Sequence, residues 1–328
     1  MKAILIDENN KLIWTDVSDP ILSPGNVIVE IHAAALNRAD LLQRAGTYPS
    51  PEGWPEWMGL ELAGVITEIS DEAKEKSNFK AGDKICALVG GGAYAEKISI
   101  PYELLLPIPK GWSMEEASTI PEAFITSYLN IFEEGHLKKG QTVYIAAGSS
   151  GLASAAIPMA KAFGAKVITS VRRAETVDKI KNLGADYIIV LEKESVSTAF
   201  KRLESEGTPV NVCMDCIAGD DVGNAMQYMA KGGYWIVIAT LAGTVTEVNL
   251  KALYTRGLHL VGSTLRSRSN KHKHHLLTAL YNEFWRYLED GTIKPSIYKI
   301  LDIKDAEKAH TILQNNENIG KVVLKVKN

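Results

Sequence analysis

A short glycine-rich turn is the stretch of this chain whose residue types and spacing indicate binding chemistry. Gly148, Ser149, Ser150 and Gly151 follow an apolar run (QTVYIAA, 141–147) and lead into Leu152, the first residue of a run of small helix-forming residues (LASAAIPMAKAF, 152–163). Where a strand turns into a helix, glycine permits the tight backbone, and the exposed amides and the positive end of the helix dipole attract phosphate. We expect these five residues to hold the pyrophosphate of a dinucleotide, although a Gly-x-x-Gly alone also fits an ordinary turn.

A pair of arginines follows the next apolar run and bears on the choice of dinucleotide. Proteins that prefer NAD place an acidic residue about 20 residues beyond the first glycine, to bond the ribose 2′-hydroxyl. This chain has Ser170, Val171, Arg172 and Arg173 there. Because a guanidinium binds a phosphate that a carboxylate would repel, we predict that Ser170, Arg172 and Arg173 bind the 2′-phosphate of NADPH. The alternative is that both arginines are solvated surface charges.

The elements that must position these residues form a regular series. Five further β-rich runs follow the glycine-rich turn, each separated by a helical or loop segment: 165–171, 186–191, 210–217, 234–240 and 258–265. Strands that alternate with helices give a doubly wound parallel sheet, a Rossmann unit, whose ligands bind at the carboxyl ends of the strands. We therefore also expect Thr240, at the end of its run, among the cofactor-binding residues.

The rest of the chain predicts a second, β-rich domain. Residues 1 to about 120 contain short strands divided by Gly and Pro turns, as in an antiparallel barrel-like domain, and residues 112–135 read as two helices broken at Pro121. The last strand, GKVVLKV (320–326), alternates in a way that suits the sheet of the first domain. We predict an α/β protein in which residues 1–122 and 267–328 form one domain and residues 123–266 form the Rossmann domain.

Composition excludes several classes of protein. The chain has 328 residues, a formal net charge of −3 and three cysteines. Neither a basic footprint for nucleic acid nor an apolar run long enough to span a membrane is present, and the cysteines are too few for a disulfide framework. Cys213 and Cys216 resemble a CxxC motif, but they fall in an expected strand and are read as packed thiols. We expect a cytoplasmic protein with a small-molecule substrate.

Four sequence runs carry a resemblance to a known family. They are LNRADLLQRAGTYPSP (36–51), MGLELAGVI (58–66), TLRSRSNKHK (264–273) and NIGKVVL (318–324). With the glycine-rich turn, they resemble the medium-chain dehydrogenase/reductase superfamily, in which a Rossmann domain interrupts a GroES-like catalytic domain. Within it, the chain is similar to zinc-independent NADPH quinone oxidoreductases of the p53-inducible type and, more distantly, to zeta-crystallin.

The resemblance implies which residues face the nicotinamide. It directs attention to Tyr48 and Asn37 as catalytic residues, and to Asn37, Thr126, Leu265 and Arg266 as cofactor contacts. Tyr48 would donate a hydrogen bond to the acceptor or stack on it, and the alternative is a surface tyrosine on a Pro-rich loop. Asn37 also fits a helix N-cap.

Three neighbouring side chains are interpreted as structural. Asp40 is read as support for the turn that begins at Asn37. Trp54 and Trp57 are read as packing anchors, with substrate stacking as the alternative.

The same comparison argues against a metal. Zinc members of the superfamily use a Cys and a Gly-His-Glu where this chain has Asn37 and Gly59-Leu60-Glu61, and a leucine cannot bind zinc. His272, His274 and His275 read as a solvated helix start.

The missing zinc ligands point to an acceptor that is already electron-poor. A quinone delocalises the charge that hydride transfer creates, so it needs no Lewis acid. We expect reduction of a quinone by NADPH, with an α,β-unsaturated carbonyl as the alternative acceptor and a non-catalytic NADPH- or RNA-binding protein as the second alternative. From the family we expect a homodimer or homotetramer, formed through the edge strand 258–265.

Overall fold

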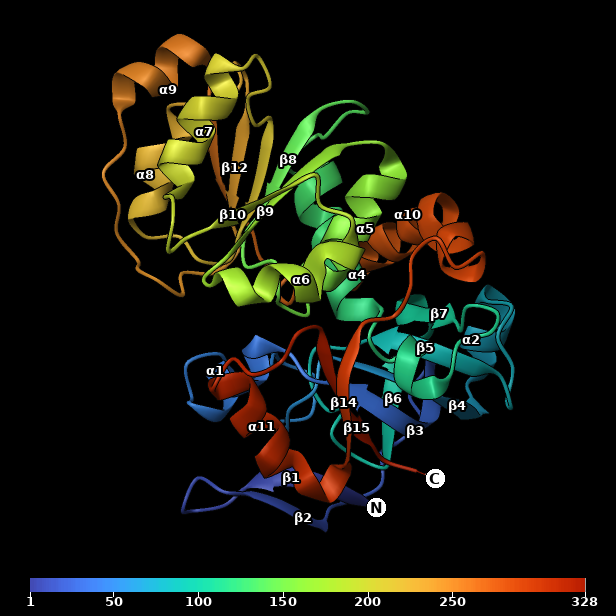
Figure 1. The fold of residues 1–328 in the computed structure, drawn as a ribbon. Coiled ribbons are helices and arrows are strands. Elements are labelled where there is room, and N and C mark those ends of the chain that lie inside the picture. Colours follow the sequence, from blue (N-terminus) through green and yellow to red (C-terminus); the bar gives the residue numbers. More distant parts are fainter. Residues whose placement is uncertain (328) are drawn as a thin grey trace. The chain divides into compact units, whose positions relative to one another are not determined.

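The computed structural model describes residues 1–327, which fold into two units. The colours of Figure 1 follow the chain from one unit to the other. The first unit is discontinuous and consists of Met1–Ile125 and the segment that begins at Arg266, and the second is Thr126–Leu265. The chain therefore leaves the first unit, builds the second, and returns to the first. One of the two crossings falls inside helix α4 (Pro121–Tyr128).

The first unit is built on a seven-stranded sheet and a separate hairpin. The sheet has the order β14-β15-β3-β4-β5-β7, with β6 also paired to β3, and all its pairs are antiparallel except β14 with β15. Its strands are β3 (Asn26–Ala35), β4 (Glu61–Ile69), β5 (Lys84–Leu88), β6 (Lys97–Pro101), β7 (Leu105–Pro107), β14 (Ile297–Asp302) and β15 (Lys321–Lys325). The hairpin pairs β1 (Lys2–Ile6) with β2 (Leu12–Asp16).

Strand β15 brings the last residues of the chain into contact with the first part. It pairs antiparallel with the end of β3, where Val323 lies opposite Ala35, and this pairing confirms that the alternating run 320–326 belongs to the first sheet. Helices pack around this unit: α1 (Arg38–Arg44), α2 (Asp71–Lys76), α3 (Met114–Ala117), α10 (Asn270–Glu289) and α11 (Ala306–Gln314). Short 3₁₀ turns follow β6 and β14: Tyr102–Leu104 and Ile303–Asp305.

The predicted break at Pro121 is confirmed, and its cause is local. Helix α3 ends at Ala117, and α4 begins with Pro121 as its first residue, a position at which the missing amide hydrogen costs no helical bond. Helix α4 then widens into a π-helical turn, Leu129–Glu133, which the sequence pattern does not reveal.

The second unit is the predicted Rossmann unit. All six strands are parallel in the order β10-β9-β8-β11-β12-β13, and the sheet consists of β8 (Thr142–Ile145), β9 (Lys166–Val171), β10 (Tyr187–Val190), β11 (Val212–Asp215), β12 (Tyr234–Val237) and β13 (His259–Gly262). Its helices are α5 (Ala153–Phe163), α6 (Val177–Ile180), α7 (Val196–Ser205), α8 (Asp220–Met226) and α9 (Leu250–Arg256), with 3₁₀ turns Ala174–Thr176 and Lys181–Leu183.

Alternate residues of the buried strands serve the two faces of this sheet. Val143 and Ile145 of β8 pack with α5, whereas Tyr144, between them, packs with α7 on the other face, which α8 shares (Figure 1). Because both faces of the sheet are covered in this way, β8 reads as a continuous apolar run. Within the described residues, no helix is both long and apolar enough to cross a membrane.

Candidate functional site

The glycine-rich turn joins β8 to α5, as predicted. Ala147 adopts a left-handed backbone with φ of 54°, which is uncommon for a residue other than glycine. Gly148 follows, and its amide donates to the carbonyl of Ser170 at 2.8 Å. A Cβ at Gly148 would lie 2.5 Å from Thr169 Oγ1 and 3.0 Å from Ile180 Cδ1, so only glycine fits. The expected reason for this glycine was a tight backbone, but its φ lies outside the left-handed region, and the structure gives close contact with the neighbouring strand as the reason.

The start of α5 is stabilised from within the turn. Ser150 Oγ accepts a hydrogen bond from the Ala153 amide at 3.0 Å, which satisfies one of the first-turn donors that a helix otherwise leaves open. Ser149, Gly151 and Leu152 are partly exposed at the same helix start. The turn thus has the strand-to-helix geometry that suits an anion, and the binding roles of its five residues stay predictions.

The residues expected at the 2′-phosphate separate into two groups. Ser170 is buried in β9, and its hydroxyl bonds the buried hydroxyl of Tyr144 at 2.8 Å, so it does not present that group at the surface of the unit. Arg172 and Arg173 are exposed just beyond the strand. Arg173 forms an exposed ion pair with Glu175, with 3.6 Å between Nη1 and Oε1. The arginines are therefore placed where a ligand can reach them, whereas Ser170 is buried, and the cofactor-binding roles of all three residues stay predictions.

The remaining expected cofactor contacts are spread over three segments. Thr126 lies in α4, and its carbonyl accepts a hydrogen bond from Asn130 at 2.7 Å. Thr240 is exposed in the segment after β12, and Leu265 is buried at the end of the second unit. Nothing in these positions alone assigns a ligand, so their roles too stay predictions.

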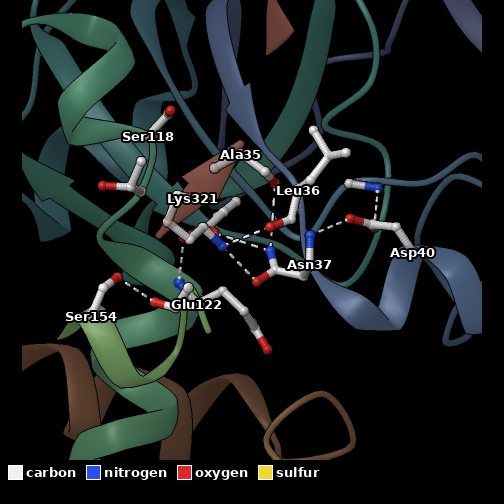
Figure 2. Close-up of polar contacts among 12 residues, drawn as sticks. Ala35, Leu36, Asn37, Asp40, Ser118, Glu122, Ser154 and Lys321 are labelled. Carbon is white, nitrogen blue, oxygen red and sulfur yellow. Dashed lines mark hydrogen bonds and ion pairs between the residues drawn. The ribbon is translucent and has the colours of Figure 1, made fainter. Parts of the chain in front are cut away.

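A buried ion pair organises the first unit around Asn37. Lys321 Nζ lies 2.6 Å from Glu61 Oε1, and both side chains are almost fully buried. Lys321 also donates to the carbonyl of Leu36 and to Asn37 Oδ1, both at 2.7 Å. Asn37 Nδ2 in turn donates to Glu61 Oε1 at 3.0 Å. Figure 2 shows the Lys321 ammonium between Leu36 and Asn37. Both ends of the Asn37 side chain are thus held by the protein.

Asp40 supports the same turn from the other side. Its carboxylate accepts hydrogen bonds from the Asn37 amide at 2.7 Å, the Gly59 amide at 3.1 Å and the Tyr94 hydroxyl at 3.0 Å. Asn37 is the N-cap of α1, as the sequence suggests, and Asp40 has the supporting role expected of it. Burial raises the pKa of Asp40 to about 6, although its three donors oppose that shift.

Glu122 is a second perturbed carboxyl, and sequence reasoning did not find it. It lies in the first turn of α4, and its backbone amide donates to Glu61 Oε2 at 2.8 Å. Burial, and then the negative charge of Glu61, raise the pKa of Glu122 to about 7, while Lys321 and Lys273 act in the opposite direction. A glutamate directly after a helix-initiating proline is so common that only the fold reveals its surroundings.

Tyr48 lies in the loop after α1 and is covered by Arg266. The guanidinium carbon of Arg266 is 4.8 Å from the centroid of the Tyr48 ring. Burial, and then the charge of Glu122, raise the pKa of Tyr48, whereas Arg266 lowers it. A phenol is ordinarily protonated at neutral pH, and the raised pKa of Tyr48 keeps it so, which leaves its hydroxyl able to donate a hydrogen bond.

Arg266 and the two tryptophans of the loop fasten it to the rest of the unit. The three nitrogens of the Arg266 guanidinium donate to Gly90 O, Tyr48 O and Gln43 Oε1, at 2.7, 2.9 and 2.7 Å. Trp57 Nε1 donates to Gly92 O at 3.0 Å, and the Trp54 ring lies so close to Gly90 that a Cβ there would approach within 2.6 Å. Both tryptophans therefore make the packing contacts expected of them, and substrate stacking on their partly exposed rings stays untested.

The zinc-binding position of related enzymes does not fit a metal ion here. The Lys321 ammonium occupies the space beside Glu61 and Asn37, and Leu60 is buried with no donor atom. A divalent cation would meet a fixed positive charge there, and neither Asn37 nor Leu60 offers the thiolate or imidazole that zinc prefers. Among residues 1–327, no three His, Cys, Asp or Glu side chains are grouped to hold a metal. His274 instead contacts the carbonyl of Glu103 at 2.8 Å.

Comparison with known families and proteins agrees with this architecture. The alcohol dehydrogenase GroES-like domain matches residues 23–110, and the zinc-binding dehydrogenase family matches residues 151–280. A quinone oxidoreductase-like protein 2 homolog from Nematostella vectensis is 28% identical, over 99% of this chain and 89% of that protein. A quinone oxidoreductase from Pseudomonas aeruginosa is 29% identical, over 92% of this chain and 91% of that protein. The crystal structure of a probable oxidoreductase from Mycobacterium abscessus has a TM-score of 0.84, 27% identity and 99% coverage of both chains.

Proposed function

Because the chain belongs to the medium-chain dehydrogenase/reductase superfamily of oxidoreductases and contains its NAD(P)-binding Rossmann domain, we propose that it reduces a quinone by hydride transfer from NADPH without zinc. The observation that carries the proposal is the buried Lys321–Glu61 pair, which holds an ammonium beside Asn37, where the zinc members of the superfamily carry a cysteine. The bound nicotinamide would supply the hydride. The residues of the chain would bind and orient the acceptor and donate the proton.

The chemistry of the acceptor follows from that fixed lysine. An alcohol or a simple aldehyde develops a strongly basic oxygen, which a Lewis acid must stabilise. A quinone spreads the charge over its ring and needs mainly orientation and a hydrogen bond. The Tyr48 phenol is a neutral donor at neutral pH, as a phenol ordinarily is, and burial raises its pKa further, so it fits that smaller task. The two quinone oxidoreductase relatives support the same acceptor class.

NADPH is proposed over NADH because of the two exposed arginines. The ion pair of Arg173 with Glu175 is solvent-exposed and is worth at most about 1 kcal/mol, so a phosphate is able to displace it. The double variant Arg172→Ala with Arg173→Ala is expected to raise KM for NADPH more than KM for NADH. Arg286→Ala, an exposed arginine on α10, is the matched control. Equal changes for both cofactors would refute the assignment.

An activated enone is the second candidate, and Tyr48 is the observation that favours it. Reduction of a carbon–carbon double bond leaves an enolate, which must be protonated at the α-carbon. If Tyr48 supplies that proton, Tyr48→Phe lowers enone turnover far more than quinone turnover. Small and equal losses would remove Tyr48 from the role of an acid.

The decisive experiment is a steady-state screen of NADPH and NADH oxidation with a panel of quinones and enones. The protein is dialysed against a chelator beforehand, and activity is expected to survive. Loss of activity that zinc restores would refute the metal-free mechanism. If no acceptor is reduced while NADPH still binds, the result favours the non-catalytic alternative. A measurement of RNA retention at physiological salt then tests whether the protein binds RNA.

We also propose that the chain forms a homodimer or homotetramer through β13. This strand lies at the edge of the Rossmann sheet, where its backbone is open to further pairing, and Leu260 on it is 46% exposed. Leu250 and Tyr254 of the neighbouring α9 are 68% and 73% exposed. Light scattering after size exclusion tests this, and Leu260→Lys is expected to shift the population towards monomer.

A further inference from the structure

Arg266 is the most heavily engaged cation of the first unit that no step above employs. Only 6% of the residue is exposed. Its three guanidinium nitrogens each donate to a different segment: the loop after β5 at Gly90, the loop after α1 at Tyr48, and α1 itself at Gln43. Its own carbonyl accepts a hydrogen bond from Lys273 Nζ at 2.9 Å. Arg266 is therefore a fixed point to which three segments are attached.

The position of Tyr48 depends strongly on Arg266. It lies in the segment between α1 and β4, where no helix or strand fixes the backbone. Arg266 holds it twice, through the hydrogen bond to its backbone carbonyl and through the guanidinium that lies over its ring. A loop side chain held at both backbone and ring loses little further freedom when a substrate arrives.

Only arginine meets these geometric demands. A planar guanidinium presents donors along its edge while its face stacks on an aromatic ring, whereas a lysine ammonium is a point charge on a flexible stem. The charged groups that act on this pair are Glu122 from α4, Asp40 from α1 and Lys273 from α10. Glu122 opposes the effect of Arg266 on Tyr48, so the arginine also balances a nearby carboxylate.

We propose that Arg266 is a positioning residue, which acts on the reaction through Tyr48 by fixing its backbone and its ring. The inference rests on the reductase function proposed above. It replaces the expected direct contact of Arg266 with the cofactor by an indirect role, because only 6% of the residue is exposed and each guanidinium nitrogen already donates one hydrogen bond within the protein.

A double-mutant cycle on the full-length protein tests the proposal. Arg266→Lys is expected to lower kcat with an enone acceptor by about tenfold in the wild-type background, with KM for NADPH changed less than about twofold. In a Tyr48→Phe background the same change is expected to cost less than about twofold, because the hydroxyl that it positions is gone. Arg286→Lys is the matched control, because Arg286 also stacks on a tyrosine, Tyr287, at 4.6 Å but is exposed on α10.

Several results would overturn the assignment. Equal losses from Arg266→Lys in both backgrounds would show that Arg266 acts independently of Tyr48. A large rise in KM for NADPH in both backgrounds would return it to the cofactor. A Tyr48→Phe enzyme as fast as the wild type would leave Arg266 with nothing to position.

A measurement without substrate separates this inference from the proposed function. With fluorotyrosine incorporated, the ¹⁹F resonance of Tyr48 is identified as the signal that Tyr48→Phe removes. Arg266→Lys is expected to move that resonance towards the solvent-exposed position and to increase its H₂O/D₂O isotope shift, whereas Arg286→Lys leaves both unchanged. An unmoved resonance overturns the inference even if a quinone is reduced. A moved resonance in a protein that reduces no acceptor sinks the proposed function but keeps Arg266 as the residue that holds Tyr48.

Discussion

Replacing Lys321 with methionine should destabilise the first unit more than any other single loss of charge described above. The change leaves the Glu61 carboxylate buried without its cation, and it removes the donor from Leu36 O and Asn37 Oδ1. Breaking a buried pair in this way costs about 3–5 kcal/mol, because the remaining charge is uncompensated. For a domain of this size, that loss lowers Tm by roughly 6–20 °C.

The control for this prediction lies on the same strand. Lys325 of β15 pairs with Glu115 at 3.5 Å, but its side chain is 38% exposed. Lys325→Met should therefore cost no more than about 1 kcal/mol. Adding Glu61→Gln to Lys321→Met removes the stranded charge, so the double variant should recover part of the loss.

Tryptophan fluorescence during denaturant unfolding is the appropriate assay. All the tryptophans except Trp235 lie in the first unit, so the signal reports mainly on that unit. If Lys321→Met unfolds within about 1 kcal/mol of Lys325→Met, the reasoning about the buried pair is wrong. A double variant less stable than Lys321→Met alone would contradict it as well.

Three further predictions concern packing and pH. Gly148→Ala should lower the free energy of unfolding by about 1–3 kcal/mol in thermal unfolding, because the added Cβ meets Thr169. Gly262→Ala, where a Cβ would meet nothing, is the control and should cause no such loss. An unchanged stability of Gly148→Ala would show that the turn relaxes freely. Burial lowers the pKa of His310 to about 4, so as pH falls the unfolded state binds a proton on this residue before the folded state does. The wild type should therefore lose stability relative to His310→Leu as pH falls from about 6.5 to about 4. A stability difference that is flat with pH would contradict this. The pKa of Asp40 is raised to about 6, so its effect on stability has the opposite sign. Relative to Asp40→Asn, the free energy of unfolding of the wild type should fall by about 3 kcal/mol as pH rises from about 4 to about 6. Urea unfolding measures this difference, and a rise instead of a fall would refute the prediction.

The fold was largely predictable because its signals are local. Apolar runs separated by helical segments predicted the parallel sheet, and the glycine-rich turn was placed correctly between β8 and α5. The return of the chain to its first sheet was predicted from the alternation in 320–326 alone. The π-helical turn after Tyr128 was not, because no residue type marks it.

The site was predictable only where a residue acts through its own neighbourhood. Asn37 as an N-cap and Asp40 as its support follow from spacing within one turn. Lys321 and Tyr94 reach that turn from distant strands and loops, so only the fold reveals them. Ser170 was expected at a phosphate because it ends a strand, yet strand alternation turns its hydroxyl towards Tyr144. Side-chain direction at a strand end depends on register, which the sequence did not show.

The late position of Lys321 has a consequence for synthesis. On the ribosome, residues 126–265 emerge complete and are able to fold while the first unit still lacks β15. Until the final strand leaves the exit tunnel, the Glu61 carboxylate has no ammonium to receive it, and the end of β3 remains an open edge. A truncated nascent chain should therefore carry a folded second unit and an unfinished first unit, whose exposed apolar surface and open strand edge would attract chaperones.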